Sequence, residues 1–271
     1  MSEWTSDFFD QSNPLYLTVD AGIGTLVLNR PHKKNAINME TWDHMPAYIA
    51  ALENNPEVRV VVVMSSTEGS FCAGADISEF ADIALDADLR ERQRVGIREG
   101  QRRLARLKKP TIAMIDGPCI GAGCGLSIHC DFRIASLRSK FGITPAKLGL
   151  IYPLNDTKHL VDLVGPSHAK KILFTAGIFS AEEALRMGLV DEVVQVEDLE
   201  LAVKAFAASM VPVSQYSLRG IKKSIQRILD GQADDDDTTS KWFTDAHTSS
   251  DYKEGVDAFM AKRKPKFTWN D

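Results

Sequence analysis

The segment Thr111-Ile112-Ala113-Met114-Ile115, followed after a short turn by Gly121-Ala122-Gly123-Cys124-Gly125, decides the fold of this chain. Its first part is a short apolar run, which predicts a buried strand. Its second part is a run of small residues, which predicts a tight loop that leads into a helix. The segment is therefore one strand-loop-helix unit.

An earlier stretch repeats this pattern. Val60-Val61-Val62-Val63-Met64 predicts a strand that is covered on both faces, and Phe71-Cys72-Ala73-Gly74-Ala75-Asp76-Ile77 leads from it toward another helix. Small residues allow a ligand to approach the backbone, and free N–H groups at a helix start can bind negative charge. Two such loops that face one point would form an oxyanion hole. Tight packing of helix on strand, with no ligand, explains the same spacing.

The flanking sequence extends these units into an α/β protein. Residues 15–19 and 24–28 predict a β-hairpin, residues 39–52 predict a helix, and residues 132–135 predict a short strand. Ser180-Ala181-Glu182-Glu183 predicts a capping box at the start of another helix.

The pattern becomes mostly helical toward the C-terminus. The acidic run at residues 234–237 fits a solvated loop and a helix N-terminus better than a metal site, because consecutive side chains diverge. We expect an α/β core over residues 1–200 and a C-terminal helical region over residues 201–271.

Composition excludes several classes of protein. The 271 residues include 37 acidic and 32 basic side chains, and the resulting net charge of −5 disfavours nucleic acid as the main partner. No apolar run approaches the roughly 18–20 residues that span a bilayer, so no membrane partner is expected. The four cysteines form no C-x-x-C pair, so no metal site is expected: Cys72, Cys119, Cys124 and Cys130. Residues 1–7 lack the features of a secretory signal, and we expect a cytoplasmic protein.

Residues 78–108 form a basic stretch with helical character. Nine arginines and lysines lie between residues 90 and 109, above a thin apolar stripe. A solvated helix with one packed face explains this pattern. Attraction of an anionic ligand, of RNA or of a membrane surface would explain it too.

Seven blocks in a fixed order resemble the enoyl-CoA hydratase/isomerase family, which is also called the crotonase superfamily. Together they extend over most of the chain. They are residues 28–37, 71–77, 109–117, 121–131, 141–150, 184–191 and 254–263.

The resemblance implies a crotonase-like spiral of ββα units, with C-terminal helices that form a homotrimer, often paired into a hexamer. It implies a coenzyme A thioester as the substrate and no tightly bound cofactor. The backbone N–H groups of Ala75 and Ala122 would form the oxyanion hole. The resemblance places further residues along coenzyme A: Arg30, Lys33, Asn35 and Ala36 near its nucleotide, Ala73, Asp76 and Ile77 along its adenine and pantetheine, and Phe259 and Lys262 reaching it from a neighbouring subunit. A solvated surface charge is the alternative role of Lys262.

The chain departs from the family at its proton-handling positions. The two glutamates of the family's hydratases correspond to Gly125 and Pro145, and neither residue can transfer a proton. The acid expected of dienoyl-CoA isomerases near this site corresponds to Pro153. Hydration by the two-acid route is therefore in doubt.

Two residues are candidates for the missing chemistry. Residues 141–152 resemble the methylmalonyl-CoA decarboxylase branch, which shares Thr144-Pro145 and a tyrosine that matches Tyr152. That branch differs at two other positions, because it has a histidine where this chain has Ala75 and a glutamate where this chain has Gly125. Asp156 would lie near the acyl pocket, and it could instead cap a helix that starts at Thr157.

The neighbouring polar residues are weaker candidates. Asn155 would also lie near the acyl pocket, and His129 is expected to be a packed histidine.

These observations predict an acyl-CoA-processing enzyme of the hydratase/isomerase type that stabilises a thioester enolate in a backbone oxyanion hole. Two alternatives stay open. One is a decarboxylase-like enzyme that uses Tyr152, and the other is a catalytically silent CoA-binding protein.

Overall fold

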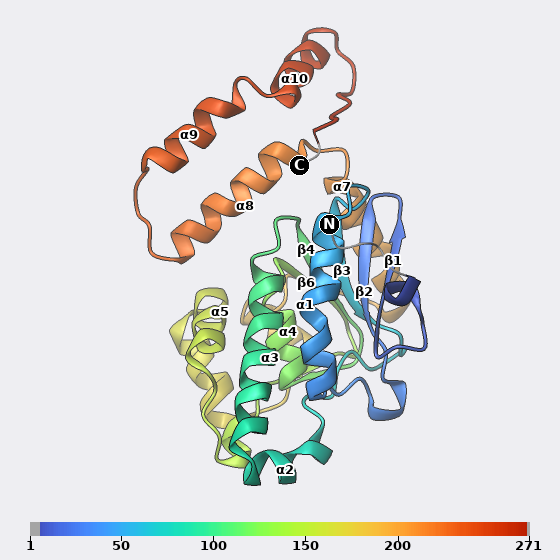
Figure 1. The fold of residues 1–271 in the computed structure, drawn as a ribbon, viewed down its shortest axis with the longest axis vertical. Coiled ribbons are helices and arrows are strands. Elements are labelled where there is room, and N and C mark those ends of the chain that lie inside the picture. The colour runs from blue at the N-terminus through green and yellow to red at the C-terminus, as the bar shows by residue number, and fades with distance from the viewer. Residues whose placement is uncertain (1–5, 270–271) are drawn as a thin grey trace.

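A six-stranded sheet forms the centre of the computed structural model, which describes residues 6–269 (Figure 1). The strand order is β1-β2-β3-β4-β6-β9. The first two strands are antiparallel and the others are parallel, so the predicted hairpin is confirmed. The strands are β1 (Leu15–Asp20), β2 (Ile23–Leu28), β3 (Val60–Ser65), β4 (Thr111–Ile115), β6 (Phe132–Ser136) and β9 (Glu192–Val194). Within residues 1–7, which lack the features of a secretory signal, residues 1–5 lie outside the described part of the chain.

A second, three-stranded sheet lies beside the loop of small residues. It contains β5 (Pro118–Ile120), β7 (Lys140–Gly142) and β8 (Phe179–Ser180). Its strand β5 directly precedes Gly121, whose N–H donates to the carbonyl of Gly142 at 2.7 Å. This sheet therefore fixes the start of the second strand-loop-helix unit.

Helices cover both faces of the main sheet. The larger core includes residues of α1 (Met39–Asn54), α3 (Ala87–Ala105), α4 (Ala122–Ser127), α5 (Leu154–Thr175) and α6 (Ala181–Arg186). The opposite face is covered by α7 (Leu199–Met210), whose Leu199, Val203 and Ala207 pack on β3, β4 and β6. Helix α7 contains residue 200. The predicted boundary between the α/β core and the C-terminal region therefore falls within a helix that packs on the main sheet.

The basic stretch is not one helix. It forms η3 (Ile77–Glu79), α2 (Phe80–Leu85) and α3, with a break at Asp86, whose extended backbone and side chain cap α3. Gly96 and Gly100 of α3 pack closely on Trp42 of α1. Several arginines on the outer side form exposed ion pairs, among them Arg92–Asp43, Arg94–Glu91, Arg102–Glu99 and Arg103–Glu99. Within this segment, α3 packs one face on α1 and exposes the other face to solvent.

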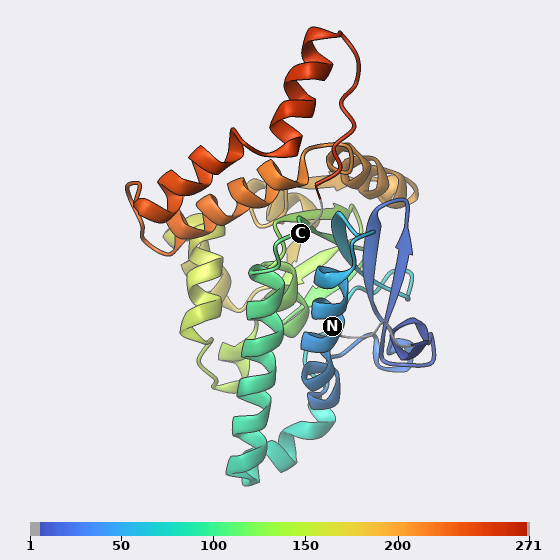
Figure 2. The same cartoon turned by 45° about the horizontal axis from the view of Figure 1, so that its top comes forward.

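The predicted C-terminal helices are α8 (Gln215–Leu229), α9 (Asp237–Ala246) and α10 (Ser250–Met260). In both ribbon views α9 and α10 extend away from the main sheet (Figures 1 and 2). Asp236 of the acidic run caps α9 and forms a capping box with Thr239. The short 3₁₀ helices are η1 (Ser6–Phe9), η2 (Pro31–Lys33), η4 (Pro145–Leu148) and η5 (Val196–Asp198). Within residues 6–269, every helix is too short or too polar to cross a membrane.

Candidate functional site

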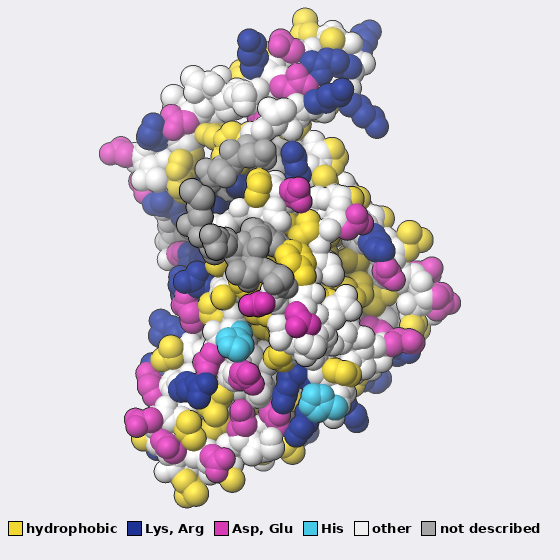
Figure 3. Space-filling view, turned by 45° about the vertical axis from the view of Figure 1, so that its right-hand side comes forward, with side chains coloured by type: hydrophobic (Ala, Val, Ile, Leu, Met, Phe, Trp, Pro, Cys, Tyr) yellow, Lys and Arg dark blue, Asp and Glu magenta, His cyan; other side chains and the backbone are white. Residues whose placement is uncertain are grey.

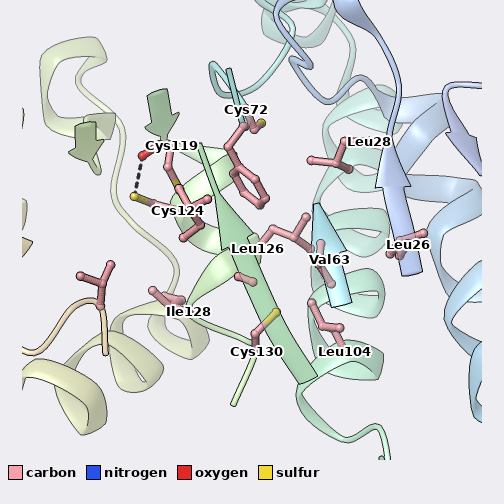
Figure 4. Close-up of a cluster of buried hydrophobic side chains, with 14 of the residues drawn as sticks. Leu26, Leu28, Val63, Cys72, Leu104, Cys119, Cys124, Leu126, Ile128 and Cys130 are labelled. Atoms are coloured by element: carbon pink, nitrogen blue, oxygen red, sulfur yellow. Dashed lines mark hydrogen bonds between the residues drawn. The ribbon is translucent and has the colours of Figure 1, made fainter. Parts of the chain in front are cut away.

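The two strand-loop-helix units are joined through their backbones. The N–H of Cys72 donates to the carbonyl of Pro118 at 2.8 Å, and the N–H of Ile120 donates to the carbonyl of Cys72 at 2.9 Å. Cys72, Cys119 and Cys124 all lie in the buried cluster of Figure 4, where the Cys124 thiol donates to the carbonyl of Cys119. These cysteines are buried core residues.

Glycines allow the two loops to approach each other. Gly74 and Gly121 have φ angles of 122° and 51°, a region that side-chain-bearing residues rarely adopt. A Cβ atom on Gly121 would lie 3.7 Å from the Cα atom of Gly74, which is an ordinary van der Waals contact, so the two loops are in direct contact. The residues that follow them, Ala75 and Ala122, are therefore carried on neighbouring stretches of backbone.

Ala75 and Ala122 present backbone donors at this junction. Their N–H groups have no backbone acceptor within the described part of the chain. The N–H of Asp76, directly after Ala75, donates to Ile37, and the N–H of Gly125, three residues after Ala122, donates to Gly121. Both alanines are half-buried. Two unpaired N–H groups on adjoining loops can bind one negatively charged oxygen.

The turn over residues 30–36 is bound to the first loop. Arg30 pairs with Asp76 at 2.9 Å, and the Asn35 side-chain amide donates to Ser70 at 3.0 Å. Arg30 also donates to the carbonyl of Ala36, and the N–H of Ala73 donates to Lys34 at 3.0 Å. The structure therefore brings together one group of predicted coenzyme A residues: Arg30, Lys33, Asn35, Ala36, Ala73, Asp76 and Ile77.

Asp76 organises that turn as a carboxylate. The hydroxyl and N–H of Ser78 donate to it, and hydrogen bonds from Ser78 and Arg30 lower its pKa to about 2. Lys33 lies 3.8 Å from the same carboxylate and leaves 43% of its side chain exposed. The exposed lysine and the exposed Ile77 are free to contact a ligand.

Phe259 and Lys262 lie in a different part of the molecule. Phe259 is on α10 and is 82% exposed, and Lys262 follows the end of that helix. Basic side chains gather there on the surface (Figure 3), namely Lys262, Arg263, Lys264 and Lys266. Because α10 extends away from the sheet, one chain does not bring these two residues to the turn at residues 30–36 (Figures 1 and 2).

Polar side chains surround Gly125 on α4. A Cβ atom at this glycine would lie 2.8 Å from Gln101 Nε2 and 3.6 Å from the Tyr152 hydroxyl. That hydroxyl is buried and has no hydrogen-bond partner within residues 6–269. Burial, and then the nearby Asp156, raise the pKa of Tyr152 well above its usual range, so the phenol stays protonated.

Asp156 belongs to the same cluster. The expectation that it caps a helix starting at Thr157 is wrong: α5 begins at Leu154, and the Asp156 side chain is 4% exposed within its first turn. Burial raises the pKa of Asp156 to about 6, and the amides of Asn155 and Gln101 limit the rise. A carboxyl with such a pKa can both donate and accept a proton near neutral pH.

His129 follows α4 and is buried, as expected. Its Nδ1 lies 2.6 Å from the carbonyl of Gly125, and because a carbonyl only accepts, Nδ1 carries the proton. Burial and the neighbouring His159 together lower the pKa of His129 to about 3. Nε2 is therefore an unprotonated acceptor, 3.9 Å from an oxygen of Asp156, and the two residues do not form an ion pair.

The structure also adds a residue that the sequence argument missed. Gln101 is 2% exposed, and its Nε2 lies 2.8 Å from the place of a Cβ atom on Gly125. In the sequence, Gln101 stands out as a polar residue on the apolar stripe, between Ile97 and Leu104. Pro145 starts η4 and Asn155 is exposed, whereas the Tyr152 hydroxyl and the Asp156 side chain are buried.

Comparison with known proteins agrees with this arrangement. The family model described as enoyl-CoA hydratase/isomerase matches residues 18–270. A crotonyl-CoA hydratase of Syntrophomonas wolfei is 34% identical, covering 93% of this chain and 97% of its own. A short-chain-enoyl-CoA hydratase of Clostridium acetobutylicum is 35% identical, covering 93% and 96%.

Solved structures give the same answer for the fold. An enoyl-CoA hydratase/isomerase family protein from Hyphomonas neptunium superimposes with a TM-score of 0.93 at 36% identity, over 96% of this chain and 99% of that one. The mixed α/β core and C-terminal helices are thus the crotonase fold, as predicted. From its fold and its sequence alike, the chain is an enzyme of the hydratase/isomerase type and belongs to the enoyl-CoA hydratase/isomerase family.

Proposed function

We propose that this enzyme binds an acyl-CoA thioester and stabilises its enolate at the N–H groups of Ala75 and Ala122. The observation that carries the proposal is the pair of unpaired N–H groups on two loops that hydrogen bonds hold together. Each donor of such a site typically stabilises the transition state by about 3–4 kcal/mol. Coenzyme A would lie along the turn at residues 30–36, where Arg30 and Lys33 supply positive charge.

Asp156 is the proposed proton-transferring group. It replaces the acids that the family resemblance leads us to expect at Gly125 and Pro145. Its pKa of about 6 allows both protonation states at neutral pH, and its burial keeps bulk water from competing for the proton. The proposed reaction class is proton transfer at or next to the α-carbon of the thioester, as in hydration or isomerisation.

A panel of acyl-CoA thioesters tests this proposal. Loss of the enoyl absorbance of crotonyl-CoA reports hydration, and chromatography of the products reports isomerisation. The Asp156→Asn variant should lose about 10²–10⁴-fold in turnover while it still binds the thioester. The matched control is Asp162→Asn, which removes a carboxylate of the same helix that pairs with Lys158, and it should keep wild-type turnover. Wild-type turnover by Asp156→Asn would contradict the assignment.

Decarboxylation is the second candidate, and Tyr152 favours it. Its buried, protonated hydroxyl lies beside Gly125 without a partner in the described residues, and decarboxylation needs enolate stabilisation more than a strong base. Release of carbon dioxide from methylmalonyl-CoA, abolished by Tyr152→Phe, would support this reaction. Binding of acyl-CoA with no turnover of any panel member would favour the catalytically silent alternative.

A further inference from the structure

Asp116 joins the two strand-loop-helix units at the point where their loops begin. It directly follows β4, and its Oδ2 atom accepts a hydrogen bond of 2.7 Å from the N–H of Gly69, which follows β3. The next residue, Gly117, lies so close to this glycine that a Cβ atom on it would be 2.0 Å from the Gly69 carbonyl oxygen. The chain segments that leave β3 and β4 are therefore fixed to each other at Gly69.

Two further residues hold the Asp116 carboxylate. Ser136, the last residue of β6, donates to Oδ1 at 2.7 Å, and the Arg138 guanidinium donates to Oδ1 at 2.8 Å and to Oδ2 at 2.5 Å. Each carboxylate oxygen thus accepts two hydrogen bonds. Burial alone would raise the pKa of Asp116, but the hydrogen bonds from Arg138, Ser136 and Gly69 outweigh it, so the pKa is lowered and the group is charged at neutral pH.

A row of backbone contacts leads from this carboxylate to the alanine donors. After Gly69, Cys72 pairs with residues 118–120 as a neighbouring parallel strand would, through the two hydrogen bonds described above. The row ends where Gly121 contacts Gly74, and these two glycines directly precede the alanine donors. The alignment of the two loops is therefore fixed at one end by the carboxylate and at the other end by the contact between the glycines.

We propose that Asp116 is a positioning residue, whose carboxylate sets how the two loops align and thereby sets the spacing of the N–H groups of Ala75 and Ala122. The inference rests on the proposed oxyanion hole. Asp116 acts through the backbone, because five residues lie between Gly69 and Ala75 and five lie between Asp116 and Ala122. Loss of the carboxylate should therefore weaken the polarisation of the thioester carbonyl.

Infrared difference spectroscopy of a bound thioester tests the proposal. The probe is butyryl-CoA with ¹³C at the thioester carbonyl, because it has no double bond to hydrate and because hydrogen bonds from an oxyanion hole lower the frequency of its carbonyl band. Asp116→Asn keeps the shape of the side chain but replaces one acceptor oxygen by an amide group that only donates. The band of the bound probe should be lowered less in this variant than in the wild type.

Turnover provides a second readout. With any member of the acyl-CoA panel that the wild type converts, Asp116→Asn should lower kcat by about 10–10²-fold and leave KM little changed, since a misplacement of about 1 Å can cost 10²-fold. Asp191→Asn is the matched control, because Asp191 also accepts hydrogen bonds from a backbone N–H and from a guanidinium, both of Arg133 on β6. The control should retain the wild-type band and the wild-type rate.

The results separate the role of Asp116 from the proposed function. A band that is not lowered in the wild type would contradict the oxyanion hole, and the role of Asp116 with it. A band that is lowered equally in the wild type and in Asp116→Asn would overturn the role of Asp116 alone. An equal change in Asp191→Asn, or a weaker affinity for the probe with an unchanged band, would overturn that role too.

Arg138→Ala tests the same contact if Asp116→Asn does not fold. The Arg138 side chain is 38% exposed, so the fold should tolerate its loss, which removes two of the four hydrogen bonds to the carboxylate. The band should change in the direction expected for Asp116→Asn. Arg94→Ala removes a similar bidentate pair with Glu91 and should leave the band unchanged. If Arg138→Ala and Arg94→Ala both retain the wild-type band, the proposal is overturned.

Discussion

Asp156 is buried in a way that opposes its ionisation. Its side chain is 4% exposed, and no lysine or arginine of the described chain lies within ion-pair distance of it. Burial raises the pKa of this carboxyl from 3.8 to about 6. The folded protein therefore holds the proton more tightly than the unfolded chain does, and folding becomes less favourable as pH rises from about 4 to about 6.

We expect the Asp156→Asn variant to be more stable than the wild type at pH 8 by about 1–3 kcal/mol, because a shift of about two pKa units corresponds to about 3 kcal/mol. At pH 4, where the folded carboxyl is protonated, the advantage should shrink or disappear. Urea unfolding at both pH values measures the difference. An advantage of equal size at pH 4 and pH 8 would show that ionisation of Asp156 is not its cause.

The roles of single residues were the least predictable part of the site. The sequence identified Asp156 as a candidate but left open a helix cap, because an aspartate near a helix start commonly has that role. The outcome depended on the position of the Pro153-Leu154 boundary, since a start at Leu154 turns Asp156 inward. Gln101 could not be connected to Gly125 without the structure, because 23 residues, which include strands β4 and β5, lie between them.

At the scale of secondary-structure elements, the loop around Cys72 and helix α4 are packed closely. A Cβ atom on Gly123 would lie 2.7 Å from the Cβ atom of Cys72. We expect Gly123→Ala to push the two loops apart, to destabilise the protein by about 1–3 kcal/mol and to reduce turnover at least tenfold. Urea unfolding and steady-state kinetics would measure the two effects.

Gly220→Ala is the matched control for this substitution. Nothing lies within 4 Å of the added methyl group on α8, and alanine favours a helix over glycine by up to about 1 kcal/mol. The control should therefore be neutral or slightly stabilising and should keep full activity. If Gly123→Ala behaves like Gly220→Ala, the spacing of the two loops does not determine activity.

Local patterns predicted these elements well. The apolar runs became β3 and β4, the hairpin formed β1 and β2, and the Ser180 capping box is present with both of its hydrogen bonds. Each of these depends on residues close together in the chain. The break at Asp86 was not predicted, because apolar residues recur with helical spacing on both sides of it. The break depends instead on the side chain of Asp86, which caps α3.

At the scale of the whole molecule, the C-terminal helices expose apolar side chains. Ile221, Ile225 and Ile228 on α8 are each more than half exposed, as are Phe259 and Met260 on α10. The family resemblance predicts that these helices form a trimer. We expect light scattering to give a mass of three or six times 29.9 kDa, and Ile225→Asp with Ile228→Asp to lower it. A wild-type mass of 29.9 kDa at micromolar concentration would contradict this expectation.

Complementation between subunits can test where Lys262 acts. A Lys262→Ala enzyme should have a raised KM for the thioester, because a charge near the phosphates is lost, and Asp156→Asn should be inactive. If Lys262 reaches a neighbouring subunit, oligomers assembled from both variants contain some sites with both native residues. Unfolding and refolding the two together should then restore part of the wild-type rate at low substrate. Equal mixtures of separately refolded variants are the control, and no gain over them would place Lys262 in its own subunit's site or outside any site.

The unpaired N–H groups of Ala75 and Ala122 limit how amino-acid substitutions can alter this site. A backbone donor is supplied by every residue except proline, and at these two positions the side chain is already a methyl group. An alanine scan would therefore pass over both residues without a signal. Replacing either peptide bond by an ester, which removes one N–H group and leaves the side chain in place, probes them directly. Substitutions can therefore act on this site only through the surrounding side chains, as at Gly125 and Asp156.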